Sequence, residues 1–154
     1  MNALTDLFTL DRIALDNPSK SRAEAFAAAG ALFAKEAGFL EADSVVGFLN
    51  AREDLGSTAL GAGVAIPHGR VKGLKQPIAA FIKLKEPIEF AAPDGEAVSI
   101  LIFLLVPEKA TQQHLEILSS IAQLLSDPDA RKALANEAGP EQVYHLLQHW
   151  GSQS

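Results

Sequence analysis

The sequence contains no cysteine, and this absence excludes several classes of protein. Disulfide scaffolds, cysteine-ligated zinc sites, iron–sulfur proteins and thiol nucleophiles all need that residue. Long hydrophobic runs are also missing, since the longest, Ile100–Val106, is far shorter than the roughly 20 residues of a membrane-spanning helix. Met1–Leu10 lacks the basic start and apolar stretch of a signal peptide. We therefore expect a cytoplasmic protein without membrane insertion.

Positive charge is scarce as well. Lys and Arg number 13 against 19 Asp and Glu, which gives a formal net charge of −6. Binding to nucleic acid depends on clustered positive charge, so we expect no nucleic-acid partner. Hydrophobic residues make up 48% of the 154 residues, which is enough for a proper core. The length predicts a single domain over residues 1–154.

Helical spacing of apolar residues comes before and after a block of strand-like segments. Helices are expected from Ser21 to about Gly38, from Asp43 to about Glu53, and from starts near Thr111, Pro128 and Pro140. Strands are expected at Arg12–Leu15, Val64–Ile66, Ile78–Lys85 and Val98–Val106. The last of these is almost wholly apolar, which is typical of a strand covered on both faces. The order predicts an α/β fold, a three-layer α/β/α sandwich on a small mixed β-sheet.

A glycine-rich segment around His68 is the first candidate site. The predicted strand Val64–Ile66 would deliver His68 just past its carboxyl end, where ligands bind in open α/β sheets. Gly69 would let the chain leave in a conformation closed to other residues. Gly61 and Gly63 leave backbone N–H groups uncrowded, as an anion-binding concavity requires. A structural turn histidine is the alternative interpretation of His68.

His114 is the second candidate, in the first turn of the helix expected from Thr111. The apolar face of this helix is expected to consist of Leu115, Leu118, Ile121, Ala122 and Leu125. Leu118 and Ile121 share the face of His114, so His114 is expected to point toward the core. A helix N-terminus also favours a negatively charged ligand. The alternative is a core histidine that is hydrogen-bonded to a backbone carbonyl.

The segment Thr58–Gly69 resembles the active-site segment of enzyme IIA domains of the phosphotransferase system, in the fructose/mannitol/nitrogen class. Two further patterns are similar to those of the family: Arg52-Glu53 before the loop, and Leu104–Pro107 followed by Gln113-His114-Leu115. Details that favour the nitrogen-regulatory branch are Pro87–Phe90, Pro93–Gly95, Pro107–Ala110 and Ser126–Pro128. The resemblance covers nearly the whole chain and implies the type-2 IIA fold.

The resemblance also implies roles for individual residues. His68 would accept a phosphoryl group on Nε2, which requires a neutral imidazole. Arg52 would pair with that group and His114 would donate a hydrogen bond to it. Thr58 or nearby backbone N–H groups would complete the phosphate cradle, and Glu53 would orient Arg52 or its surroundings. Supporting glycines in this scheme are Gly61, Gly63 and Gly69. No metal or cofactor is implied. The family often has Asn at the position of Ala62, which removes one candidate polar contact.

The implied function is that of a phosphotransferase acting as a phosphocarrier. An HPr-like carrier protein would supply the phosphoryl group, which comes ultimately from phosphoenolpyruvate through an enzyme I. The output would be mainly regulatory, with target proteins such as potassium-transport systems and sensor kinases. A first alternative is a fructose- or mannitol-type IIA that passes the phosphoryl group to a IIB cysteine for sugar uptake. A second is a phosphate-inert binding module, like the anion-exchanger cytoplasmic domains that share this fold.

Two other groups of residues have a simpler interpretation. His145 and His149 stand at a spacing known from metal ligands, but the helix lacks the Glu of a metalloprotease motif and no third ligand is evident. We expect both on a solvated helix face. Lys72, Lys75, Lys83 and Lys85 form a mildly basic group, either solvated surface or part of a rim on which the carrier docks.

Overall fold

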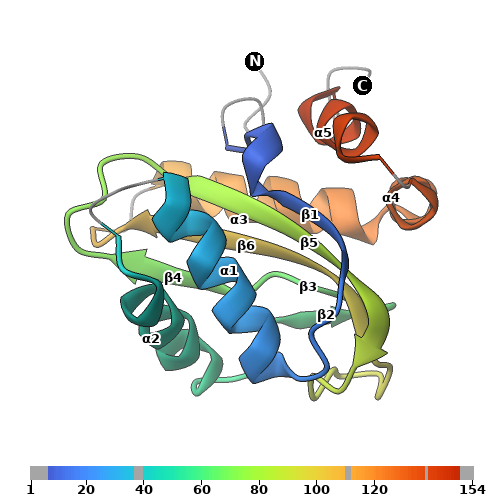
Figure 1. The fold of residues 1–154 in the computed structure, drawn as a ribbon, viewed down its shortest axis with the longest axis horizontal. Coiled ribbons are helices and arrows are strands. Elements are labelled where there is room, and N and C mark those ends of the chain that lie inside the picture. Colours follow the sequence, from blue (N-terminus) through green and yellow to red (C-terminus); the bar gives the residue numbers. More distant parts are fainter. Residues whose placement is uncertain (1–6, 37–39, 110–111, 138, 150–154) are drawn as a thin grey trace.

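A computed structural model describes residues 7–36, 40–109, 112–137 and 139–149. The strands are β1 (Ile13–Asn17), β2 (Ala59–Gly61), β3 (Val64–Ala65), β4 (His68–Val71), β5 (Ile78–Ile88) and β6 (Val98–Pro107). The helices are the 3-10 helix η1 (Leu10–Arg12), α1 (Arg22–Glu36), α2 (Ala42–Glu53), α3 (Gln112–Ser126), α4 (Pro128–Asn136) and α5 (Pro140–His149). Figure 1 shows α1 in front of a twisted sheet and α3 behind it.

The sheet is mixed and is organised around β6. Strand β5 pairs with β6 in antiparallel orientation, and β1 continues the sheet parallel to β5. Along the other edge of β6, β3 and β4 both pair in parallel, with β2 antiparallel to β3. Between β3 and β4 the pairing with β6 continues at Pro67, whose carbonyl accepts the N–H of Leu104 at 3.0 Å. The chain therefore follows β6 from β3 to β4 with one short interruption.

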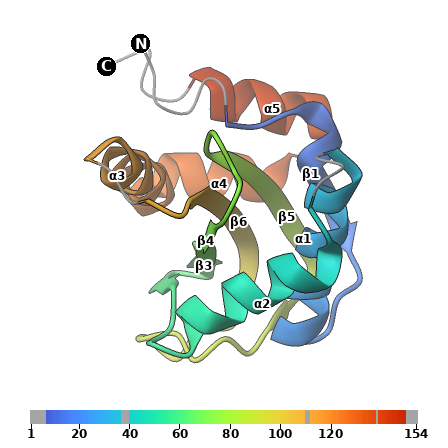
Figure 2. The ribbon, with the colours of Figure 1, turned by 90° about the vertical axis from the view of Figure 1, so that its left-hand side faces the viewer.

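Two apolar clusters lie on opposite faces of the sheet. One packs residues of α1 and α2, such as Phe26 and Leu49, against Phe103 of β6. The other packs residues of α3 to α5, such as Ile121 and Leu147, against Ile102. Figure 2 shows the two helical layers on either side of the strands. The predicted three-layer α/β/α architecture is confirmed, and so is the burial of the central strand on both faces.

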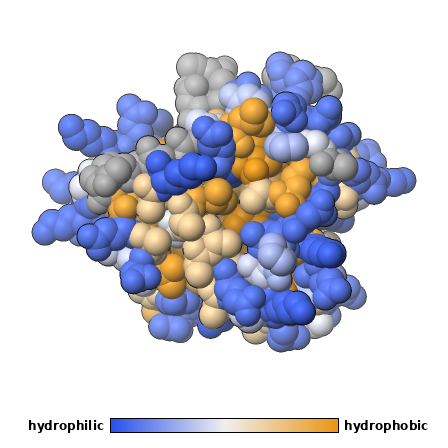
Figure 3. All heavy atoms as spheres, viewed as in Figure 1, coloured by the Kyte–Doolittle hydropathy of each residue, from blue (hydrophilic) through white to orange (hydrophobic). Residues whose placement is uncertain are grey.

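The hydropathy of the outer surface of the α1 layer reflects the amino-acid composition of that helix. Figure 3 shows hydrophilic side chains around the edge of the face seen in Figure 1, with a band of moderately apolar residues over alanine-rich α1.

The capping signals that the sequence shows at two helix starts are confirmed. Ser21 Oγ accepts the N–H of Glu24 at 3.1 Å, and the Asp127 carboxylate accepts the N–H of Asp129 at 3.0 Å. Pro128 occupies the first turn of α4.

The sequence-based expectation misses β2 and β4. His68 does lie just past the carboxyl end of β3, as predicted, but it also opens the unpredicted strand β4 and pairs with Leu104 of β6. Strand β4 is only four residues long and contains a glycine, which has low strand propensity, so this strand exists through its pairing with β6 rather than through its own pattern. Among the described helices, none has both the length and the apolar character that crossing a membrane requires.

Candidate functional site

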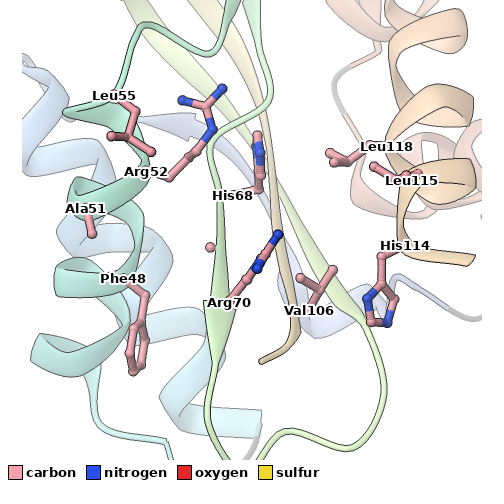
Figure 4. A pocket seen from close by; sticks show the side chains of 11 residues that line it. Phe48, Ala51, Arg52, Leu55, His68, Arg70, Val106, His114, Leu115 and Leu118 are labelled. Carbon is pink, nitrogen blue, oxygen red and sulfur yellow. The ribbon is translucent and has the colours of Figure 1, made fainter. Parts of the chain in front are cut away.

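A cavity of about 630 Å³ opens between α2, β4 and the start of α3 (Figure 4). Its lining consists of Phe48, Ala51, Arg52, Leu55, His68, Gly69, Arg70, Val106, His114, Leu115 and Leu118. The structure thus brings Arg52, His68 and His114, which are far apart in the sequence, to one cavity. Apolar side chains make up much of the remaining wall.

His68 is half-buried, and its ring is held by the main chain just before it. Nδ1 lies 2.9 Å from the carbonyl oxygen of Ile66. A carbonyl only accepts, so Nδ1 carries the proton and donates, which leaves the lone pair on Nε2. Burial lowers the pKa of His68 from 6.5, the nearby Arg52 and Arg70 lower it further, and the Ile66 hydrogen bond and Glu53 oppose the shift. The ring is therefore neutral at neutral pH and has a nucleophilic nitrogen.

Arg52 lies in the last turn of α2, and its guanidinium is beside the His68 ring in Figure 4. Its Nη1 donates to the carbonyl oxygen of Gly56 at 2.9 Å, which ties the side chain to the turn after the helix. A guanidinium has several further N–H donors in a planar fork, the geometry that matches a phosphoryl group. Arg52 is thus anchored on one side and directed at the cavity.

His114 is buried, with 6% of its surface exposed, as expected for a residue pointing toward the core. It lines the cavity from the α3 side, across from His68 (Figure 4). The prediction that Leu115 packs inward is wrong, since 59% of its surface is exposed. The buried stripe of α3 runs through Ile117 and Ile121 instead, and this turns Leu115 away from the core to the edge of the cavity.

Arg70 is a lining residue that the sequence analysis missed. It is exposed, it lies on β4 two positions after His68, and its positive charge lowers the pKa of His68. Alternate residues of a strand point to the same face, so a His-x-Arg pattern on a strand would have predicted this neighbour. The signal was hidden because β4 was not recognised as a strand.

Glu53 and Thr58 are buried and do not line the cavity. The Glu53 carboxylate accepts the Thr58 N–H at 2.8 Å and the Thr58 hydroxyl at 2.7 Å. Glu53 thus anchors Thr58, whereas Arg52 is oriented by the hydrogen bond that it donates to the Gly56 carbonyl. Both predicted supporting residues lie behind the cavity wall, where they shape the turn between α2 and β2.

Gly61 and Gly63 lie away from this cavity. They flank Ala62 at the tip of the β2–β3 hairpin, and φ is positive at all three (+92°, +56° and +81° for residues 61 to 63). The Ala62 N–H donates to the carboxylate of Asp94 at 2.8 Å, so a side chain of the protein occupies this concavity. The hairpin also lies along a different part of β6, because Val64 pairs with Ile100 whereas His68 pairs further on, with Leu104.

The positive φ of Ala62 would suit Asn, the residue that the family often has at this position, since Asn tolerates positive φ.

Gly69 has a role different from the one predicted. Its φ is not among the positive values, so the chain adopts no conformation there that is closed to other residues. A Cβ at this position would instead lie 3.0 Å from the carbonyl oxygen of Phe48. The absence of a side chain lets β4 approach α2 closely, and this places His68 and Arg52 side by side.

The remaining candidate residues lie outside the cavity. Lys83 donates to the carbonyls of Leu134 and Ala135 at 3.3 and 3.1 Å, and to that of Glu137, at the end of α4. It thus binds a helix end instead of forming part of a docking rim. His145 and His149 are exposed, as expected, with ring centroids 4.2 Å apart. The described residues contain no cluster of three or more His, Cys, Asp or Glu arranged to hold a metal ion.

Comparisons with known proteins agree with this fold and identify a family. The family described as "Phosphoenolpyruvate-dependent sugar phosphotransferase system, EIIA 2" matches residues 6–150. A nitrogen regulatory protein of Pseudomonas aeruginosa is 38% identical over 147 residues, which cover 96% of each chain. The crystal structure of the nitrogen regulatory protein IIA-Ntr from Neisseria meningitidis superposes with a TM-score of 0.88 and 44% identity, over 94% of this chain and 98% of that one.

A third relative is a larger component of a phosphotransferase system with a stated substrate specificity. The 2-O-alpha-mannosyl-D-glycerate-specific EIIABC component of Escherichia coli is 30% identical over 153 residues, which cover 98% of this chain and 23% of that protein. The family match spans nearly the whole chain, and both the fold and the sequence agree with it. The chain therefore belongs to the EIIA 2 family of the phosphoenolpyruvate-dependent sugar phosphotransferase system.

Proposed function

We propose that this protein is a cytoplasmic phosphocarrier of the nitrogen-related branch of that system, with a mainly regulatory output. Its phosphoryl donor would be the phosphohistidine of an HPr-like carrier protein, and its acceptor would be Nε2 of His68. The observation that carries the proposal is the hydrogen bond from His68 Nδ1 to the Ile66 carbonyl, which leaves Nε2 unprotonated in a cavity with two guanidinium groups. Relatives named nitrogen regulatory proteins support the branch.

The transfer would follow from the chemistry of His68, Arg52 and Arg70. The lone pair of His68 Nε2 attacks phosphorus, a P–N bond forms, and the carrier's P–N bond breaks with its electron pair returning to the carrier imidazole. Phosphoryl transfer has a loose transition state, so positioning and charge stabilisation provide most of the catalysis. Arg52 and Arg70 supply positive charge beside the phosphoryl oxygens, with Arg52 positioned by Gly56. No metal or other cofactor is part of this proposal.

The rim of the cavity is suited to a protein donor. Leu55 and Leu115 are 84% and 59% exposed, and they stand on opposite sides of the cavity, on the turn after α2 and on α3. Large exposed apolar side chains beside a cavity are typical of interaction sites. When the carrier docks on them, it would exclude water from the reacting groups and strengthen the electrostatic interactions there.

A regulatory output would arise from the charge that the phosphoryl group adds. A phosphorylated His68 would place a dianionic group at the centre of a surface that is otherwise apolar and positively charged, and this changes which partners bind. The resemblance implies targets such as potassium-transport systems and sensor kinases. Target recognition and phosphoryl acceptance would therefore share one surface.

The test is a phosphorylation assay with phosphoenolpyruvate, enzyme I and the HPr-like carrier, read by intact mass spectrometry. The wild-type protein is expected to gain one phosphoryl group, and His68→Ala is expected to gain none. His145→Ala serves as a control at an exposed histidine that does not line the cavity, and it should be labelled like the wild type. Persistent labelling of His68→Ala would overturn the proposal.

A sugar-specific IIA is the second candidate, because one relative is part of an EIIABC component. In that case the phosphoryl group would pass from His68 to the cysteine of a IIB domain. Incubation of the phosphorylated protein with IIB domains from the same organism separates the two candidates. Rapid transfer to a IIB cysteine would favour sugar uptake over a regulatory role.

A further inference from the structure

Glu53 is a buried carboxylate at the end of α2, with 5% of its surface exposed. Both carboxylate oxygens accept hydrogen bonds from Thr58, one from the N–H at 2.8 Å and one from the hydroxyl at 2.7 Å. A buried charge is costly unless it is well hydrogen-bonded, so a carboxylate in this place fixes its partner firmly. Thr58 is thereby held against the end of α2.

The hydrogen bonds continue from Thr58 to His68. The carbonyl of Thr58 accepts the N–H of Ile66 at 3.1 Å. The carbonyl of Ile66 in turn accepts Nδ1–H of His68 at 2.9 Å. A series of contacts therefore runs from the Glu53 carboxylate through Thr58 and Ile66 to the imidazole ring. The N–H and the carbonyl of each of these two residues belong to neighbouring peptide units joined at Cα, so the connection works by fixing positions.

The last bond in this series decides which nitrogen of His68 reacts. A neutral imidazole has two tautomers, and the hydrogen bond made by one nitrogen determines which of them is present. Only the Nδ1–H tautomer leaves the lone pair on Nε2. If the Ile66 carbonyl moved, that tautomer would lose its preference and the ring would lose its fixed orientation.

We propose that Glu53 is a positioning residue for His68: through Thr58 it holds the Ile66 carbonyl where that carbonyl selects the Nδ1–H tautomer. The role of this tautomer in phosphoryl acceptance rests on the proposed function, whereas the series of contacts does not. Ala65, Ile66 and Pro67 are all buried, so the carbonyl sits in packed surroundings that transmit the position of Thr58.

The negative charge of Glu53 should have a second measurable effect, on the pKa of His68. The ionisable groups around His68 are Arg52 and Glu53 from α2, Arg70 from β4 and His114 from α3. The two guanidinium groups lower the pKa of His68, and Glu53 raises it. Loss of the carboxylate should therefore lower the pKa of His68 further, in addition to shifting its tautomer.

The experiment compares Glu53→Ala, Thr58→Val and the wild type by ¹⁵N NMR of the His68 ring in the full chain, well above its pKa. Glu53→Ala should populate the Nε2–H tautomer, lower the pKa of His68, and slow phosphoryl acceptance by roughly tenfold or more, since small displacements of reacting groups have effects of that size. Thr58→Val, which loses one of the two bonds to Glu53, should change in the same direction by less.

Asp94→Asn is the matched control. Asp94 also accepts two backbone N–H groups, those of Ala62 and Glu96, but its bonds lead to the hairpin tip and not to His68. An unchanged tautomer in both Glu53→Ala and Thr58→Val would overturn the proposal, as would an equal change in Asp94→Asn. If Glu53→Ala does not fold, Thr58→Val decides alone, since a tautomer shift supports the role and its absence refutes it.

The readouts also separate this inference from the proposed function. The tautomer is measured on the unphosphorylated protein and needs no carrier. A tautomer shift in the variants of a protein that accepts no phosphoryl group would leave the positioning role standing and refute the proposed function. Normal acceptance, with variants that match the wild type in rate and tautomer, would refute the positioning role alone.

Discussion

At the scale of single residues, the reactivity of His68 depends on neighbours that hold it from two sides. The Ile66 carbonyl binds one ring nitrogen, while Arg52 and Arg70 bring positive charge to the side where a phosphoryl group would sit. Two cations near a neutral imidazole lower its pKa and attract an anionic substrate, so both effects favour the same reaction. In the proposed reaction, the Ile66 carbonyl would prepare the nucleophile, and the two arginines would bind the phosphoryl group.

Arg52→Lys should slow phosphoryl acceptance markedly while the fold stays intact. Lysine keeps the charge but lacks the planar fork, and a hydrogen bond to a charged group contributes roughly 1.5–3 kcal/mol, so a decrease of about tenfold or more is expected. The measurement is the initial rate of phosphorylation by the carrier, with circular dichroism to verify folding. Wild-type kinetics in this variant would remove Arg52 from the site.

At the scale of elements, the β2–β3 hairpin shows a local strain. Ala62 is an exposed residue with φ of +56°, a conformation that residues with a Cβ rarely adopt. The Asp94 carboxylate holds the tip through the Ala62 N–H, and its two backbone hydrogen bonds lower its pKa. The hairpin is therefore maintained by a contact from a distant loop against the preference of its central residue.

Ala62→Gly should stabilise the protein by up to about 1 kcal/mol, because glycine adopts this conformation without a steric penalty. Ala27→Gly in the middle of α1 is the matched control. There the same exchange should destabilise by about 1 kcal/mol, since glycine is a poor helix former. Urea denaturation of both variants gives the two free energies of unfolding. A destabilised Ala62→Gly would contradict the strain at the hairpin.

Lys83 joins β5 to α4 by donating to carbonyls at the end of that helix. Cations stabilise helix C-termini, and this one also satisfies carbonyls that have no partner within the helix. Lys83→Met should therefore destabilise the protein by about 1–2 kcal/mol, as measured by thermal or urea unfolding. Lys85→Met, at an exposed position on the same strand, should change stability by less than about 0.5 kcal/mol.

At the scale of the whole molecule, the sheet separates two apolar layers and places the site at their edge. Helix α2 belongs to one layer and α3 to the other, and β4 lies between them with His68 at its start. A cavity formed in this way receives side chains from both layers, so its shape depends on the packing of the entire sandwich. Stability and site geometry are therefore coupled.

The lowered pKa of His68 predicts how stability changes with pH. The unfolded chain binds a proton at the ordinary pKa of 6.5, whereas the folded chain binds it only at lower pH. The unfolded state then carries more protons, so the free energy of unfolding should fall as pH decreases through 6.5 and level off below the folded pKa. Urea denaturation above and below this pH measures the change.

A His68→Gln variant lacks this proton and should show a smaller decrease over the same pH range. If the wild type kept its stability, or gained it, on acidification through pH 6.5, the imidazole would not be held neutral by its surroundings.

Local patterns predicted most of the helices and the long strands. These patterns act within a few residues, so they can be recognised from the sequence alone. Examples are the apolar run at Val98–Val106 and the helix caps at Ser21 and Asp127. The short strand β4 was not predictable, because it forms only where β6 offers a partner. The error at Leu115 has a similar origin, since the width of a buried helix face depends on what packs against it.

The sequence by itself determined the order of the helices and of strands β1, β3, β5 and β6, the burial of the central strand, and the identity of His68, Arg52 and His114 as candidates. Only the tertiary structure decided that these three line one cavity, that Arg70 lines it too, and that Gly61 and Gly63 lie elsewhere. The physical reason is that propensity, capping and hydrophobic periodicity are local, whereas a cavity arises from strand pairing and close packing between distant segments. The approach of β4 to α2 at Gly69, against the Phe48 carbonyl, is such a contact.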